Sequence, residues 1–263
     1  MFLLIFFVYP VVRVLLLGFE PGGPLLTHFQ ELWAVPLYRT VLARTFRLSL
    51  IVTAICLLLG YPVAYTIAHA PRRLAALLIT MVLIPFWISV LGRSFTWMVI
   101  LQRNGIVNQT LKTLGLIREP LALIYNPLGV YIGMTHILLP FMILSSFSVM
   151  RGINVSLIRA AATLGATEWQ TFRRVYFPLS LPGVAAGTIV VFVVGLGFFI
   201  TPALLGGGHV TTVSLLIEAT ITQTLNWGLA SALAFVLLIS ALLVLVPAIG
   251  ILNLDRMFGG SNR

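Results

Sequence analysis

Long, almost uncharged apolar segments alternate along this chain with shorter polar connections. Six of the apolar segments approach or exceed the roughly 20 residues that an α-helix needs to cross a bilayer. Apolar residues follow one another within each segment instead of alternating with polar ones, so the pattern predicts membrane helices and excludes a β-barrel. The six predicted spans cover residues 2–18, 48–68, 74–100, 128–150, 183–205 and 229–252.

The composition agrees with this pattern. Of the 263 residues, 60% are hydrophobic and only 8% are charged, whereas a soluble domain carries about 25% charged residues. We therefore expect an all-α polytopic membrane protein with about six transmembrane helices, built as a single transmembrane domain over residues 1–263. The first apolar segment lacks a basic start and a small-residue cleavage site, so we expect it to be a retained span and not a signal peptide.

The formal net charge is +10, which in a soluble protein would suggest nucleic acid. In a membrane protein the loop positions of Lys and Arg set the orientation instead, so we expect lipid contacts and no nucleic-acid partner. One face of the predicted topology collects Arg72, Arg73, Arg151, Arg159, Arg173, Arg174, Arg256 and Arg263. The other collects Arg39, Arg44, Arg47, Arg103, Lys112 and Arg118. This bias favours cytoplasmic N- and C-termini.

One polar insert, "SLIRAAATLGATEWQTFRRVYFPLSLPG" at residues 156–183, interrupts the apolar pattern. Ser156 is a suitable N-cap for a short helix. Leu157, Ala160, Ala161 and Leu164 follow at helical spacing and would form one narrow apolar stripe of mainly small residues. The stripe suits docking into a protein groove, and the alternative is an amphipathic connector that lies at the membrane surface.

A second helix is predicted to follow directly. Gly165 stands where a helix end favours left-handed backbone. Thr167 and Gln170 have the spacing of a capping box, and Pro178 and Pro182 are expected to end the helix. The insert is thus a helix–Gly–helix unit, too short to span, on the cytoplasmic face.

Charges and aromatic residues within the apolar segments mark a possible substrate path. Arg93 is costly near a helix centre, so it either lines a path, pins a re-entrant loop through backbone carbonyls, or snorkels outward to the interface. Glu218 is the one acid that we place near a path on the outer side. Four aromatic residues flank expected helix breaks and would suit a gate or a box around a cationic amine: Phe86, Trp87, Phe198 and Phe199.

Other kinds of site are missing from the sequence. No His, Cys and Asp cluster has metal-ligand spacing, so no metal site is predicted. No phosphate-binding Gly-rich loop is present, and the spans carry no paired carboxylates, so we predict no catalytic residue.

The stretch "IRAAATLGATEWQTFRRVYFPLSLPGVAAG" resembles the EAA loop of ATP-binding-cassette (ABC) importer permeases. Further stretches resemble the spermidine/putrescine-type branch of that family: "IPFWISVLGRSFTWMVIL" at 84–101, "RNGIVNQTLKTLGL" at 103–116 and "FFITPALLGGG" at 198–208. The residues that match the EAA pattern are Ala160, Ala161, Gly165, Pro178, Pro182 and Gly183.

The resemblance implies a type I ABC importer permease fold with a coupling-helix loop at about residues 151–182, in the bacterial inner membrane. It implies two ATPase subunits, a second, non-identical permease and a periplasmic substrate-binding protein as partners. ATP and Mg²⁺ would be bound by the ATPase subunits, so no cofactor is expected in this chain. The residues implied to couple to the ATPase are Arg159, Ala160, Ala161, Leu164, Gly165 and Thr167.

Two positions depart from the family pattern. The motif Glu is Arg159 here, which cannot cap the helix start and would instead face an acidic group or a lipid phosphate. Polyamine-specialised members often place an acid before Leu-Leu-Gly-Gly, where this chain has Ala203. The expected solute is therefore a small polar organic molecule that is polyamine-, opine- or amino-acid-like.

Two other classes of function are weighed against a permease subunit. A partner-independent secondary transporter or channel predicts inverted repeats and gives residues 156–183 no role. A membrane enzyme predicts the acid pairs or His clusters that the spans lack.

Overall fold

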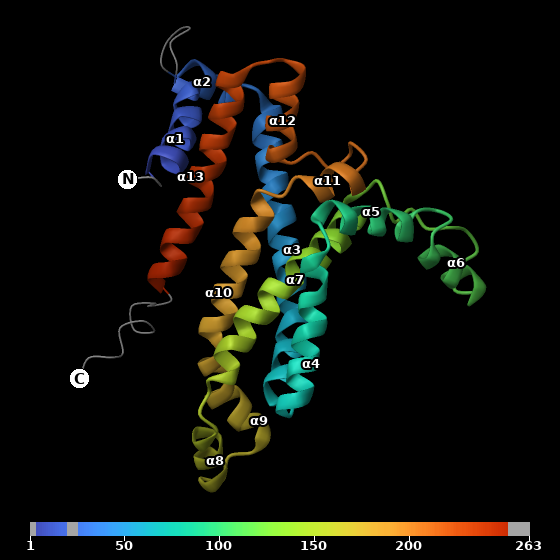
Figure 1. Cartoon of the computed structure of the whole chain (residues 1–263), viewed down its shortest axis with the longest axis vertical. Helices are drawn as coiled ribbons and strands as arrows, with labels where there is room; N and C mark the ends of the chain where they lie inside the picture. Colours follow the sequence, from blue (N-terminus) through green and yellow to red (C-terminus); the bar gives the residue numbers. More distant parts are fainter. Residues whose placement is uncertain (1–3, 20–25, 252–263) are drawn as a thin grey trace.

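The computed structural model describes residues 4–19 and 26–251, and within these ranges every regular element is helical. Figure 1 shows a tall bundle in which the longest helices run along one axis. In chain order the elements are η1 (Leu4–Val8), α1 (Tyr9–Leu16), η2 (Leu17–Phe19), α2 (Thr27–Ala34), α3 (Pro36–His69), α4 (Arg72–Leu83), η3 (Ile84–Trp87), α5 (Val90–Leu101) and α6 (Ile106–Thr113). They continue with α7 (Pro127–Arg151), α8 (Val155–Thr163), α9 (Glu168–Thr171), η4 (Phe172–Tyr176), α10 (Phe177–Leu196), α11 (Ile200–Leu205), α12 (Val213–Gln223) and α13 (Trp227–Ile251).

Four helices of the described chain are long and apolar enough to cross a membrane, and a bent helix pair raises the number to five. This confirms the all-α polytopic class. The first predicted span, 2–18, lies partly outside the described residues, and its described part consists of η1 followed by a shorter apolar helix, Tyr9–Phe19. The four long helices are Pro36–His69, Pro127–Arg151, Glu168–Leu196 and Trp227–Ala248.

Two of the predicted spans are each divided into two helices. Residues 74–100 are interrupted by η3, which contains Pro85, and the helices before and after the break are bent by 96°. Ser89 then caps α5 by accepting a hydrogen bond from the Gly92 amide at 3.1 Å. The break falls beside Phe86 and Trp87, where a helix break was expected, because a proline followed by a new N-cap ends one helix and starts another.

The predicted fifth span, 183–205, is divided in the same way. Helix α10 ends at Leu196, and α11 starts at Ile200 after the connection at Gly197. Figure 1 shows α11 beside α5, so the helices that follow the two breaks lie together.

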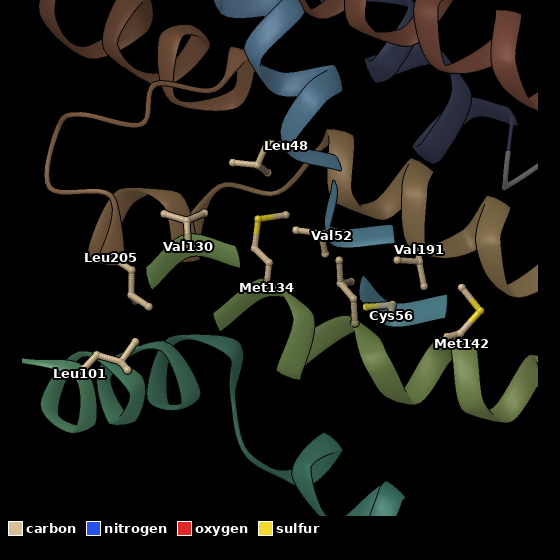
Figure 2. Packing of buried hydrophobic residues seen from close by; sticks show 10 residues of the cluster. Leu48, Val52, Cys56, Leu101, Val130, Met134, Met142, Val191 and Leu205 are labelled. Carbon is tan, nitrogen blue, oxygen red and sulfur yellow. The ribbon is translucent and has the colours of Figure 1, made fainter. Parts of the chain in front are cut away.

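The core lies where α3, α7 and α10 pack along one another. Figure 2 shows its buried side chains, among them Val52, Met134, Met142 and Val191. Glycines let these backbones approach closely. A β-carbon on Gly183 of α10 would lie 2.8 Å from the carbonyl oxygen of Ser145 on α7. Small residues at such crossings are what lipid-embedded helices use to gain close packing.

The two ends of the bundle differ in construction. Helices α8 and α9 form one end, and α2 and the far end of α12 form the other (Figure 1). Helix α3 has 34 residues, a length of about 50 Å, and so exceeds the roughly 30 Å hydrocarbon layer. Its charged residues, Arg39, Arg44 and Arg47, all lie in its first turns, so this part, opposite α8, is the one expected beyond the hydrocarbon layer.

We predict that Gly183→Val destabilises the bundle, because the added side chain meets the α7 backbone. Overpacking of this kind costs about 1–3 kcal/mol, so thermal unfolding in detergent should begin at a clearly lower temperature. The matched control is Gly250→Val on α13, where a β-carbon meets nothing within 4 Å. Equal unfolding temperatures for the two variants would contradict the proposed close contact.

Candidate functional site

The predicted helix–Gly–helix unit is present, and its first helix is α8. The N-cap differs from the prediction: Asn154, not Ser156, caps the helix, and its side-chain oxygen accepts from the Ser156 amide at 2.9 Å. Asn offers an amide oxygen at the right distance, which makes it an equally good cap. Leu157 and Leu164 of the predicted stripe are 47% and 88% exposed.

The rest of α8 divides between an exposed face and a partly buried face. Arg159 and Ala160 are exposed beside Leu157, whereas Ala161 is half-buried. Ile158 faces the bundle and packs against a cluster that includes Tyr176. The helix is thus held to the bundle by one face and presents apolar surface on the other.

The turn between the two helices has the predicted geometry. Gly165 has φ +82°, and the amide of Ala166 donates to the Ala161 carbonyl at 3.1 Å. Thr167 and Gln170 form the capping box: the Thr167 amide donates to Gln170 Oε1 at 3.0 Å, and the Gln170 amide donates to Thr167 Oγ1 at 3.3 Å. These features follow from local sequence, and all of them are confirmed.

The end of the second helix was predicted wrongly. Pro178 and Pro182 do not stop it, because α9, η4 and α10 form one continuous helix from Glu168 to Leu196. Element η4 is a π-helical segment, and Pro178 falls in the first turn after it, where its missing N–H is tolerated. The unit therefore continues into a membrane helix without an intervening loop.

Stacked rings connect this helix to α3. Trp169 stacks on Phe172 with ring centroids 5.7 Å apart, and Phe172 stacks on Tyr176 at 6.1 Å. Tyr65 of α3 meets Tyr176 edge to face at 5.1 Å and Phe172 at 5.9 Å. The exposed Trp169 is thus connected through aromatic contacts to the end of a second membrane helix.

A cavity of about 660 Å³ lies between α8 and the ends of the long helices. Beside it, Arg151 at the end of α7 donates to the Ala68 carbonyl at 2.8 Å and so ties α7 to the end of α3. No local sequence pattern predicts the cavity, because it forms between segments that are far apart in the chain. Its lining residues are Tyr65, Ala68, His69, Met150, Arg151, Ile153, Val155, Ile158, Ala162, Ala166, Glu168, Thr171, Phe172 and Tyr176.

The four predicted path aromatics do lie at the helix breaks, but no ring contact joins them. Phe86 meets Phe141 of α7 edge to face at 5.1 Å. Trp87 is 91% exposed, and Phe198 packs partly buried on the core. The two breaks turn these rings toward different neighbours, so the four do not pack on one another, and the gate or aromatic box stays a prediction.

Phe199 and Glu218, predicted separately as path residues, do share one hollow. It measures about 350 Å³ and is lined otherwise by Ser214, Ile217, Ile221 and Thr222. Thr222 Oγ1 lies 3.4 Å from Glu218 Oε1. Its walls are almost entirely apolar, formed by the Phe199 ring and aliphatic side chains, and Glu218 is the one acidic residue among those that line it.

Arg93 does not snorkel to the interface, because it is only 8% exposed. Its Nε and Nη1 atoms are buried without a hydrogen-bond partner in the described residues. The neighbouring Ser94 hydroxyl lies 2.9 Å from the Thr201 hydroxyl, which links α5 to α11. Arg93 therefore stands at the junction of the two broken spans. No group of residues in the described ranges could hold a metal ion.

The chain is a bundle of apolar helices in which two spans are broken. A polar helix–Gly–helix unit continues into one of the membrane helices. These features are those of a multi-pass membrane transport protein. The chain belongs to the family of binding-protein-dependent transport system inner membrane components, whose model matches residues 42–257. It is therefore an inner-membrane permease subunit of an ABC importer, a system that also needs a substrate-binding protein and an ATPase.

Curated relatives support this assignment. The chain is 34% identical to the spermidine/putrescine transport system permease protein PotB of Escherichia coli (strain K12), over 80% of this chain and 77% of PotB. The PotB of Haemophilus influenzae is 36% identical over 80% of this chain and 74% of that protein. The E. coli inner membrane ABC transporter permease protein YdcU is 33% identical over 63% of this chain and 57% of YdcU.

Solved structures support the fold. A bacterial ABC transporter that imports the acidic polysaccharide alginate superposes with a TM-score of 0.72 at 21% identity, covering 95% of this chain and 91% of that chain. A bacterial alginate ABC transporter in complex with an alginate pentasaccharide-bound periplasmic protein gives a TM-score of 0.75 at 20% identity. The superposition covers 100% of this chain and 93% of that chain.

We predict that Gly165→Ala loosens the turn between α8 and α9. A β-carbon would meet nothing within 4 Å there, so the cost of about 1 kcal/mol arises from the left-handed backbone alone. Amide hydrogen exchange at the end of α8 should accelerate about fivefold.

The control is Gly152→Ala, because Gly152 has ordinary φ of −83° and its nearest contact is 3.5 Å away. Unchanged exchange in Gly165→Ala would show that the turn does not depend on glycine.

Proposed function

We propose that the α8–α9 unit is the coupling element that receives an ATPase subunit from the cytoplasm. The observation that carries the proposal is the exposed apolar stripe on α8, joined through Gly165 to a helix that continues unbroken into the membrane. Large exposed apolar patches mark sites of protein contact. Arg159, Ala160, Ala161, Leu164, Gly165 and Thr167 form or shape this surface.

The unit can act as a lever because it is attached at two points. A push on α8 passes through the Gly165 turn into the continuous helix of α9 and α10. From that helix it reaches α3 through the rings of Trp169, Phe172 and Tyr65. The cavity beneath α8 leaves room for the unit to shift relative to the helix ends. Movement of α8 would thus be passed to two of the three core helices.

The assembly that we propose follows the family. Two ATPase subunits bind and hydrolyse ATP with Mg²⁺, so this chain needs no cofactor and performs no catalysis. A second, non-identical permease completes the path, and a periplasmic binding protein delivers the solute. With α8 in the cytoplasm, the N- and C-termini lie on the cytoplasmic side, as the loop charges favour. The chain serves as one transmembrane permease domain.

The solute that we propose is a small, polyamine-like organic cation. The PotB relatives are named for spermidine and putrescine transport, and Phe199 and the acidic residue Glu218 line one hollow. Polyamine-specialised members often carry an acid at the position of Ala203. Because this chain lacks that acid, we assign the acidic contact on this side of the path to Glu218. Arg93 acts as a positioning residue at the junction of the broken spans.

We predict that Leu164→Ser weakens retention of the ATPase subunit on an affinity-tagged permease. Burial of a leucine side chain contributes about 1.5–3 kcal/mol, so affinity should fall about ten- to a hundredfold, with uptake lost in proportion. Because Leu164 is 88% exposed, the yield and unfolding temperature of the permease itself should not change.

The matched control for Leu164 is Leu114→Ser, since Leu114 is 66% exposed and follows α6, far from α8 (Figure 1). Equal ATPase retention in both variants would contradict coupling through α8 and leave the unit as a connector.

We predict that Glu218→Gln reduces putrescine and spermidine uptake into vesicles that contain the assembled transporter. Loss of one partly solvated charge contact costs up to about 1 kcal/mol, or about fivefold in rate. ATPase assembly should stay intact. Glu119→Gln is the control, because Glu119 is exposed and outside the hollow. If Glu218→Gln takes up both polyamines at the parental rate, the hollow does not lie on the solute path.

A further inference from the structure

A second hollow, distinct from the coupling element and from the hollow at Glu218, lies toward the end of the bundle opposite α8. It has a volume of about 450 Å³ and is enclosed by the first part of α3, the start of α7 and the connection between α11 and α12. None of its lining residues is acidic. They are Arg44, Arg47, Leu48, Pro127, Tyr131, His209, Val210, Thr211 and Thr212.

Two arginines give the hollow its positive charge. Arg44 and Arg47 are three residues apart on α3, so their side chains extend from the same face of the helix. Neither guanidinium has a hydrogen bond or ion pair to any other described residue. Two adjacent like charges repel each other, and an anion between them would relieve the repulsion and bind several donors at once.

The backbone around the hollow is fixed in place. Thr45, between the two arginines, is buried and accepts a hydrogen bond from the Val213 amide at 3.0 Å, which ties the start of α12 to α3. Gly207 and Gly208 have φ of +54° and +79° and turn the chain toward His209. The hollow also borders the N-terminus of α12, whose helix dipole adds partial positive charge.

The position of the hollow along the helices indicates what fills it. The uncharged apolar stretch of α3 begins at Leu48, directly after Arg47, and the apolar stretch of α7 begins beside Pro127. Both helices thus leave the hydrocarbon layer at the level of the hollow, which is where lipid phosphates lie. Tyr131 is of the type that prefers this interface.

We propose that this hollow binds the phosphate group of an anionic phospholipid of the outer leaflet. Arg44 and Arg47 hold the phosphate, His209 and the hydroxyl of Thr211 add donors, and Leu48 and Val210 contact the start of the acyl chains. The assignment to the outer leaflet rests on the proposed function, because that function places α8 in the cytoplasm. A bound lipid would pin the α11–α12 connection to α3 beside the broken spans.

The test uses the assembled transporter in nanodiscs of phosphatidylethanolamine mixed with phosphatidylglycerol. Native mass spectrometry after detergent extraction counts the phosphatidylglycerol retained by the parental chain and by variants. Each of Arg44→Gln and Arg47→Gln should lower retention about fivefold, and the double variant more strongly. Arg39→Gln, on the same helix but outside the hollow, should retain lipid like the parent. Equal retention in the double variant and the parent would overturn the proposal.

Two further measurements separate other sources of the anion. If inorganic phosphate alone binds by calorimetry in an arginine-dependent way and displaces the lipid, the ligand is a free anion and the lipid assignment is wrong. If cross-linking joins the hollow to an acidic residue of the binding protein or of the second permease, with lipid retention unchanged, the hollow is a protein interface. The double variant should retain the ATPase subunit on α8 as strongly as the parental chain does. Failure of the lipid proposal is therefore distinguishable from failure of the proposed coupling through α8.

Discussion

The close approach of α7 to α3 and α10 is the contact on which the rest of the structure depends. The hydrophobic effect does not drive helices together inside lipid, so their association depends on close van der Waals packing of the backbones. Gly60 on α3 and Gly183 and Gly187 on α10 all face α7, and a β-carbon on any of them would lie within 3 Å of an α7 atom. This three-helix core is the fixed body against which both the coupling element and the broken spans are positioned.

The proposed coupling element, the α8–α9 unit, depends on its connections to this three-helix core. At one end, α8 is a separate helix with a glycine turn, and it presents apolar side chains to solvent. At the other end, the same polypeptide runs through a π-helical segment into α10 with no loop that could absorb motion. Aromatic stacking adds a second connection to α3. A soluble subunit bound to α8, as we propose, would therefore act on helices of the core and not on a tethered surface loop.

The broken spans have a different relation to the core. Breaks at Pro85 and at Gly197 turn α5 and α11 away from the bundle axis, and the Ser94–Thr201 contact joins them. Irregular backbone at membrane depth is tolerated where protein or a water-filled cavity satisfies its polar groups. Arg93 is buried at this junction, and two of its donor atoms have no hydrogen-bond partner among the described residues.

The sequence by itself determined the features that depend on neighbouring residues. Apolar segment length gave the membrane class and most of the spans, and local signals gave Gly165 and the Thr167–Gln170 capping box, because helix ends are governed by residues a few positions apart. Tertiary structure decided the rest. Pro178 and Pro182 lie within a helix because the preceding π-helical segment and packing on α7 accommodate them. The pairing of Phe199 with Glu218, and of Arg44 and Arg47 with His209, joins residues that are distant in the chain. Only the packing of whole helices brings such side chains together, and no local pattern carries that information.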